Sequence, residues 1–162
     1  MHAVHVAAPD EADAVAALVN AAFLVESFFK RGNRTTPEEI RRMMHSGEFL
    51  VMGDRPGAPD ACVYARIDGS RGFFGMLSVG PGQQGRGLGR ALIAAVEARA
   101  AAAGCDTMEI HVVNLREELP ALYRRLGYTE TGTLPFPDEE EITRPCHFIV
   151  MTKELDGVRP PA

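Results

Sequence analysis

Cysteine is scarce in this 162-residue sequence, and tryptophan is absent. Cys62, Cys105 and Cys146 lie far apart and form no C-x-x-C pair. Isolated cysteines of this kind argue against a disulfide framework and against a zinc site, and the histidines show no metal-ligand spacing. We therefore expect three reduced, buried thiols and no bound metal.

An excess of basic residues is also missing. The 17 Lys and Arg against 22 Asp and Glu give a net charge of −5 and a pI near 5.5. Because the basic residues are scattered along the chain, nucleic acid is not an expected partner. The apolar N-terminal stretch lacks a basic leader and carries Asp10, Glu11 and Asp13, so we expect neither a signal peptide nor a membrane span. These features predict a cytoplasmic protein without membrane association.

The chain is near the usual size of one domain, and its 46% hydrophobic content can build one substantial core. We expect a single domain over residues 1–155 and a flexible C-terminal tail at 156–162. Apolar periodicity predicts an α/β arrangement, and short connections between the three central strands imply antiparallel neighbours. The expected strands are 4–8, 49–52, 62–67, 72–79, 107–114 and 147–155, and the expected helices begin near residues 9, 36, 88 and 119.

A glycine-rich stretch is the most informative segment of the sequence. It reads VGPGQQGRGLGRAL, from Val79 to Leu92, and places five glycines in ten residues between an expected strand and an expected helix. Unpaired N–H groups and the helix dipole both favour a negative ligand at such a helix start, so phosphate is the natural guest. A merely flexible turn is the alternative, because glycine serves any turn that needs a positive φ.

Two overlapping motifs in this stretch predict different ligands. The pattern G-x-G-x-x-G beginning at Gly80 would indicate a nicotinamide-dependent oxidoreductase. Pro81 removes a donor from that pattern, and the preceding strands look antiparallel, so no βαβ unit is expected before the loop. The other motif is Q-x-x-G-x-G, beginning at Gln84. A P-loop is excluded because no Gly-Lys-Ser/Thr follows.

The second motif, with LSV before it, Arg-Ala-Leu after it and the later segment LYRRLGY, resembles the GNAT N-acetyltransferase superfamily. The resemblance spans nearly the whole chain in element order. It implies a mixed, mostly antiparallel α/β sheet of six to seven strands, flanked by about four helices, with splayed central parallel strands. One departure is the insert Arg116-Glu117-Glu118, which lengthens the interval from Asn114 to Tyr123.

The resemblance also implies acetyl-CoA as cosubstrate and acetyl transfer to a primary amine by direct attack in a ternary complex. In that family the glycine-rich loop binds the pyrophosphate of acetyl-CoA, and the strand before it pairs with the pantetheine arm. The residues that would bind acetyl-CoA here are Leu77, Ser78, Val79, Gln84, Gly85, Arg86, Gly87, Leu88, Gly89, Arg90 and Asn114.

Acetyl transfer to an amine requires a neutral nucleophile, a donor for the developing oxyanion and a proton for the departing thiolate. By resemblance, Tyr123 is the general acid, and the backbone N–H of Val79, at a strand bulge, is the oxyanion donor. Glu109 and His111 lie two residues apart, so both side chains leave the same strand face and either could deprotonate the amine. Glu109 lies five residues before Asn114, where some family members that modify protein N-termini place an acidic base, and we rank it slightly above His111.

Each of these residues also has a plain structural interpretation. Tyr123 has apolar neighbours at core spacing, Glu109 could be a strand-end carboxylate, and His111 could be a hydrogen-bonded core histidine. Asn114 could simply end its strand. For the whole chain, the alternative to an enzyme is a non-catalytic acyl-CoA-binding or regulatory module with the same loop.

Two segments are expected near the acceptor. Residues 28–31 occupy the place where the family's loop between the first two helices overhangs the acceptor. Residues 134–141 form a proline-bracketed acidic loop that could attract a cationic amine. The acceptor stays open between a small metabolite, a peptide N-terminus and a lysine. Because the family often dimerises, the chain could also form a homodimer.

Overall fold

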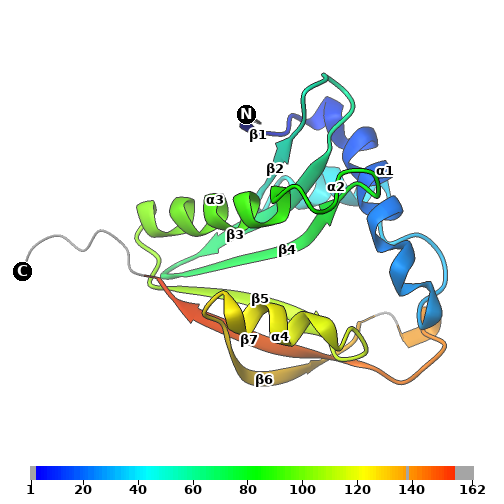
Figure 1. Cartoon of the computed structure of the whole chain (residues 1–162), viewed down its shortest axis with the longest axis vertical. Coiled ribbons are helices and arrows are strands. Elements are labelled where there is room, and N and C mark those ends of the chain that lie inside the picture. The colour runs from blue at the N-terminus through cyan, green and yellow to red at the C-terminus, as the bar shows by residue number, and fades with distance from the viewer. Residues whose placement is uncertain (1–2, 138, 156–162) are drawn as a thin grey trace, which may run out of the picture.

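A twisted sheet forms the centre of the protein in the computed structural model, which describes residues 3–137 and 139–155 (Figure 1). The expected tail at 156–162 lies outside the described residues. Within them the sheet has seven strands in the order β1-β2-β3-β4-β5-β7-β6. The strands are β1 Val4–Val6, β2 Glu48–Met52, β3 Ala61–Asp68, β4 Arg71–Val79, β5 Thr107–Val113, β6 Thr129–Pro135 and β7 His147–Glu154.

Neighbouring strands of the sheet run antiparallel, except for β4 and β5. The parallel pairing of β4 with β5 covers only residues 71–73 and 107–109. β5 then pairs with β7 along its whole length. Beyond the short parallel contact β4 and β5 diverge, and the sheet opens into a wedge between them (Figure 1). The expected mixed sheet with splayed parallel strands is confirmed.

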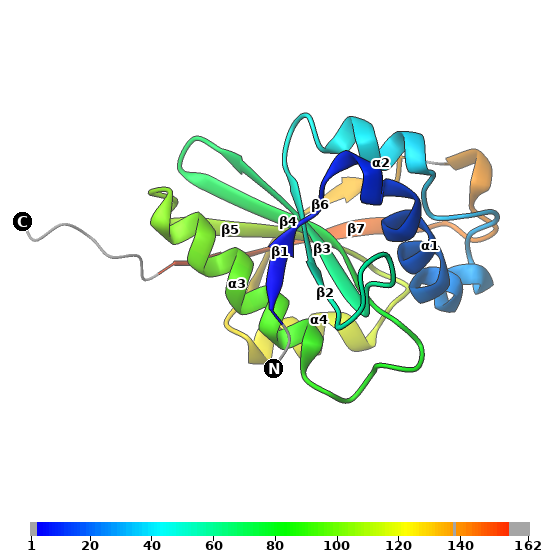
Figure 2. The same cartoon turned by 90° about the horizontal axis from the view of Figure 1, so that it is seen from above.

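Helices cover both faces of the sheet, with α3 on one side and α1 and α2 on the other (Figure 2). One core cluster joins α3 and α4 to the strands through Leu92, Tyr123 and Phe74, and a second joins α1 and α2 through Val19 and Ile40. The helical segments are η1 Pro9–Glu11, α1 Ala12–Ala22, η2 Phe23–Phe28, α2 Pro37–Met43, α3 Leu88–Ala102, α4 Glu118–Arg125 and η3 Glu139–Glu141, where η marks a 3-10 helix.

Local sequence explains where these elements begin. The Thr36 hydroxyl accepts a hydrogen bond from the Glu39 amide over 3.1 Å and caps α2, with Pro37 in the first turn. Burial alternates from residue to residue along β4, as expected for a strand with one face in the core and the other face only partly covered. Gly87 ends the glycine-rich loop in a left-handed conformation, and α3 starts at the next residue.

Three expectations from sequence need correction. β6 was not expected, and all seven of its residues are exposed, so it lacks the apolar alternation that marks a strand. Cys146 is only half-buried, whereas Cys62 and Cys105 are buried as expected. Finally, β4, α3 and β5 do form a parallel βαβ unit around the glycine-rich loop, so its apparent absence is not an argument against a dinucleotide. None of the described helices is long and apolar enough to cross a membrane.

Gly47 tests how tightly the end of α2 packs on the sheet. A Cβ at this position would overlap the backbone oxygen of Ala65 and lie 2.7 Å from the Tyr64 hydroxyl. We expect Gly47→Ala to lower the free energy of unfolding by about 1–3 kcal/mol through overpacking. Urea denaturation measures this, with Gly132→Ala as control because an added Cβ there meets nothing within 4 Å. Equal losses in the two variants would contradict the packing account.

Candidate functional site

The opening between β4 and β5 exposes backbone groups that a regular sheet would pair. The Gly80 amide donates to the Asp60 carbonyl of the loop before β3 over 2.8 Å, and Val79 faces Ala61 in the register. Successive peptide groups alternate in direction along a strand, so the N–H and C=O of Val79 point away from β3, toward the opening. The amide of Val79 is left unpaired by the sheet, and a ligand lying between the strands could supply a partner for it.

A bulge in β4 precedes Val79. Gly75 pairs with Tyr64 and Ser78 with Cys62, so two residues of β4 oppose one of β3. Met76, inside the bulge, has a φ of 52°, which is unusual for a residue other than glycine. The expected bulge is therefore present, but it lies before Val79 rather than at it. The Ser78 hydroxyl is buried and donates to the Met76 carbonyl over 2.9 Å, so this hydroxyl is already engaged within the protein.

The glycine-rich loop leads into α3, whose first turn lies beside this opening and has no side-chain cap. Gly87 is the N-cap residue of α3, with a φ of 78°, and no side chain caps the first turn. Gly85 also has a positive φ, of 82°. The first N–H groups of a helix have no intrahelical partner. An added Cβ at either glycine would meet no atom within 4 Å, so the space at this loop is open, and the loop fits an anionic group such as a pyrophosphate.

The other residues of the loop differ in their exposure. Gln84, Gly85, Arg86 and Arg90 are exposed, while Leu88 is buried and fixes the first turn of α3 in the core. The Arg86 guanidinium donates to the Gln83 side chain. Gly89 lies close to β4, where an added Cβ would lie 3.7 Å from Val79 and 3.9 Å from Leu77. The structure therefore brings the loop, α3 and the end of β4 together.

Glu109 and His111 form a hydrogen-bonded pair on β5. His111 Nε2 lies 2.7 Å from Glu109 Oε2, and Arg71 Nη1 donates to Glu109 Oε1 over 2.6 Å. Burial raises the pKa of the Glu109 carboxyl, but the hydrogen bonds from His111 and Arg71 outweigh burial and lower it overall. Glu109 is therefore a stable carboxylate with both oxygens engaged, which favours orienting His111 over accepting a proton itself.

Aromatic side chains surround this pair. The ring of His111 lies 4.9 Å from that of Phe73 on β4 and 5.9 Å from that of Phe148 on β7. Both imidazole and carboxylate remain partly accessible, each with 22% of its side chain exposed. The pair is thus partly shielded from water yet reachable, as proton transfer with a bound molecule requires.

Tyr123 lies on the other face of the sheet, in the cluster built by α3 and α4. It is 7% exposed, and burial raises the pKa of its phenol to about 12, partly opposed by the positive charge of Arg116. Among the described residues its hydroxyl has no hydrogen-bond partner. The neighbouring Tyr128 hydroxyl, by contrast, donates to Glu97 Oε2 over 2.7 Å. A buried hydroxyl without a protein partner calls for a ligand or water.

Asn114 has a structural contact of its own. The side-chain Oδ1 of Asn114 accepts a hydrogen bond from the backbone amide of His147 over 2.8 Å. The backbone amide of Asn114 donates to the His147 carbonyl over 2.9 Å. These bonds join the end of β5 to the start of β7. The side-chain NH₂ group of Asn114 is the part that could contact a cofactor.

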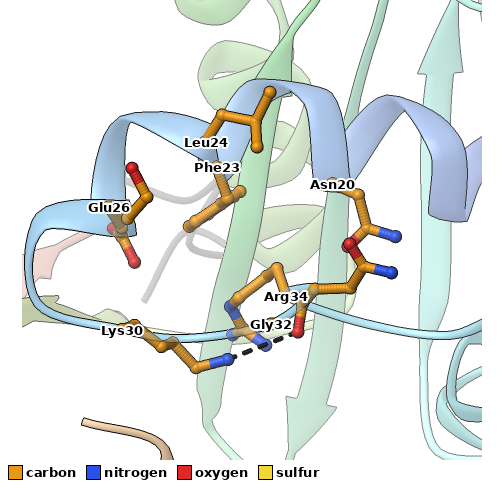
Figure 3. Close-up of a pocket in the computed structure, with 9 residues that line it drawn as sticks. Asn20, Phe23, Leu24, Glu26, Lys30, Gly32 and Arg34 are labelled. Atoms are coloured by element: carbon orange, nitrogen blue, oxygen red, sulfur yellow. Dashed lines mark hydrogen bonds between the residues drawn. The ribbon is translucent and has the colours of Figure 1, made fainter. Parts of the chain in front are cut away.

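A small hollow lies beneath η2, the segment that follows α1. Figure 3 shows Phe23 above it, with Glu26 at one end, Asn20 at the other, and Lys30 and Arg34 across from them. Its volume is about 30 Å³, room for about one water molecule. It is therefore too small, as it stands, to hold an acceptor.

The two acceptor segments expected from sequence contact each other. Lys30 Nζ lies 3.2 Å from Glu141 Oε2, and the Arg31 amide donates to the Glu141 carbonyl over 2.8 Å. Phe29 is fully buried and packs against Phe136, while Phe28 is 43% exposed. Since Glu141 is paired with Lys30, the acidic loop attracts cations less than its sequence predicts.

Sequence reasoning missed three charged residues near these groups, namely Arg71, Glu26 and Arg116. Arg71 starts β4 and meets Glu109 only because β4 and β5 pair at that point. Glu26 and Arg116 are 90 residues apart in sequence and form an ion pair over 3.1 Å. No local pattern marks such contacts. Within residues 3–137 and 139–155, no group of His, Cys, Asp or Glu is arranged to hold a metal ion.

Comparison with known proteins matches residues 18–128 to the Acetyltransferase (GNAT) family. The ribosomal-protein-S18-alanine N-acetyltransferase from Escherichia coli has a TM-score of 0.77 at 16% identity, over 100% of this chain and 99% of that one. The phosphinothricin acetyltransferase from Sinorhizobium meliloti, in complex with AcCoA, has a TM-score of 0.73 at 18% identity, over 99% and 93%. The yncA protein from Salmonella typhimurium, with its cofactor acetyl-CoA, has a TM-score of 0.70 at 20% identity, over 100% and 98%.

The two tyrosines of this region give a test of the unpartnered hydroxyl. Tyr128→Phe removes a hydrogen bond to Glu97 and should lower the free energy of unfolding by about 1 kcal/mol. Tyr123→Phe removes a buried hydroxyl that has no protein partner and should leave that free energy unchanged or raise it. Urea denaturation without ligand measures both. A loss for Tyr123→Phe as large as that for Tyr128→Phe would show that the hydroxyl has a structural partner.

Proposed function

This chain belongs to the acetyltransferase (GNAT) family, and on that premise we propose that it transfers the acetyl group of acetyl-CoA to a primary amine. The observation that carries the proposal is the opening of β4 from β5 beside an uncapped, glycine-rich helix start. Together these features offer unpaired backbone donors to an extended arm and to a pyrophosphate. The acceptor amine belongs to an unidentified small molecule or peptide.

Acetyl-CoA would contact three parts of the chain. Its pyrophosphate fits the amides of Gly85 to Arg90 at the start of α3, with Gln84 beside them, and its pantetheine arm fits the exposed edge of Leu77 to Val79. The side-chain NH₂ group of Asn114 lies at the end of β5, on the opposite side of the opening. Acetyl-CoA supplies the activated acyl group, and the protein supplies position and proton transfer.

His111 is the residue we assign as general base, with Glu109 orienting it. Glu109 holds one imidazole nitrogen at 2.7 Å and is itself held by Arg71. A lowered pKa makes Glu109 a weak proton acceptor, whereas the imidazole of histidine is the side chain that most often serves as a general base near neutral pH. This assignment reverses the order that the sequence favoured.

The reaction itself needs one bond made and one broken. The neutral amine attacks the thioester carbonyl carbon while the carbonyl oxygen accepts a hydrogen bond from the Val79 amide. The C–S bond then breaks, and the proton lost by the amine passes to His111. Tyr123 donates its phenolic hydrogen to the departing sulfur, which is a tolerable leaving group because a thiol has a pKa of about 8.5. The products are the amide and CoA.

The opening joins the two faces on which these groups lie. Glu109 and His111 occupy one face of the sheet, and Tyr123 packs in the cluster on the other. A thioester placed between β4 and β5 would present its carbonyl carbon toward His111 and its sulfur toward Tyr123. A non-catalytic acyl-CoA-binding module would need no such pair.

A cytoplasmic location and a homodimer remain predictions from the sequence.

Ligand-induced stabilisation tests the cofactor. Acetyl-CoA at a hundred times its Kd should add about 2.7 kcal/mol and raise Tm by roughly 5–10 °C in a domain of this size. Thermal unfolding with acetyl-CoA, CoA and NAD measures the shift. Both CoA species should stabilise the protein and NAD should not. No shift with either CoA species, where a known acetyltransferase responds, would refute the proposal.

Three variants separate the catalytic roles. His111→Gln and Tyr123→Phe should each lower kcat by about 100-fold or more, the usual contribution of acid–base groups, with little change in the Kd of acetyl-CoA. Glu109→Gln should cost less. Release of CoA is followed with three probe amines: a peptide with an N-terminal alanine, spermidine and 2-phenylethylamine. A greater loss for Glu109→Gln than for His111→Gln would make Glu109 the base. CoA release with none of the amines, despite binding, would favour the non-catalytic module.

A further inference from the structure

Arg116 lies in the insert between β5 and α4, and its side chain contacts two other elements. Its Nη1 donates to Glu26 Oε2 in η2 over 3.1 Å, and its Nε donates to Glu118 Oε1 in the first turn of α4 over 2.6 Å. Its amide donates to the Val113 carbonyl, and its carbonyl accepts from the Leu119 amide. Arg116 therefore connects the end of β5, the start of α4 and η2.

The two ion pairs of Arg116 differ in their exposure to water. The Arg116 and Glu26 side chains are 18% and 10% exposed, whereas Glu118 is 63% exposed. Loss of one partner from a buried pair leaves an uncompensated charge, while an exposed pair contributes little. The position of η2 depends on the contact with Glu26 far more than the position of α4 depends on that with Glu118.

Other cations near Glu26 do not replace Arg116. Lys30 and Arg34 both lie close enough to act on Glu26 electrostatically. Lys30 is engaged with Glu141 at 3.2 Å, and the guanidinium of Arg34 lies over the ring of Phe23. They can keep Glu26 compensated enough for the chain to fold without Arg116, but both lie across the hollow beneath η2 and neither links η2 to the turn after β5 (Figure 3).

We infer that Arg116 is a positioning residue for acceptor binding. Through Glu26 it fixes η2 against the turn between β5, which carries His111, and α4, which carries Tyr123. This inference rests on the proposed function and on the expectation from the family resemblance that residues 28–31 border the acceptor. η2 carries three exposed apolar side chains, Leu24, Val25 and Phe28. A segment already held in place loses less conformational freedom when it closes on an acceptor.

Hydrogen exchange tests the positioning without depending on turnover. The amides of Phe29 and Lys30 both donate to the Glu26 carbonyl over 3.1 Å. In Arg116→Gln these amides should exchange roughly tenfold faster, the effect of losing one charge-assisted hydrogen bond. Arg124→Gln is the control because it breaks an exposed ion pair of 2.6 Å between α4, the helix that follows Arg116, and Glu130 of β6. Equal exchange in the two variants would overturn the inference.

Kinetics distinguish positioning from a general structural role. With whichever of the three probe amines is acetylated fastest, Arg116→Gln should raise the KM of the amine roughly tenfold. Its kcat and the Kd of acetyl-CoA should change less than about twofold. The double variant Arg116→Gln/Glu26→Gln, which pairs two amides, should recover part of the lost KM. An unchanged KM alongside a lower Tm would reduce Arg116 to a structural residue. If the wild type does not bind acetyl-CoA, the proposed function fails, and hydrogen exchange still decides whether Arg116 fixes η2.

Discussion

The site depends on where the backbone pairing between the two parallel strands β4 and β5 ends. This pairing stops after three residue pairs. Every buried amide in a sheet needs a partner, and a continuous ladder between β4 and β5 would have left nothing for a ligand to pair with. The bulge at Met76 and the full pairing of β5 with β7 draw the two strands apart. The loop then places the start of α3 beside the same opening.

The opening also connects the proposed catalytic groups, which lie on opposite faces of the sheet. A strand sends alternate side chains to opposite faces, so Glu109 and His111 on β5 face away from the core that contains Tyr123. An intact sheet would separate these groups completely. Where the strands part, a thin molecule can reach both faces at once. The ring contacts of His111 with Phe73 and Phe148 partly shield this side chain from water.

Most of this fold could be predicted from the sequence, because its central strands and helices have clear apolar periods and glycine or proline boundaries. The pairing of Glu109 with His111 could be anticipated too, since residues two apart on a strand share a face. β6 could not, because Thr129 to Pro135 are exposed and polar and depend on β7 for their conformation. The contacts of Arg71 and Arg116 were hidden for another reason: each joins segments far apart in the chain, and only the sheet register or the packing of η2 brings them together.

Because β4 and β5 pair so briefly, the sheet consists of two halves, β1 to β4 and β5 to β7. β1 to β4 are joined mainly by successive antiparallel pairings, and β5, β6 and β7 pair only with one another apart from that contact. Pairings between segments close in the chain, such as β3 with β4 and β6 with β7, close readily because little chain must be ordered, whereas β1–β2 and β5–β7 join segments far apart in the chain. The two halves share backbone pairing at residues 71–73 and 107–109, and one core cluster packs against both of them. A molecule bound across the opening would join the two halves where their strands do not pair, so its binding should slow the unfolding of the native protein.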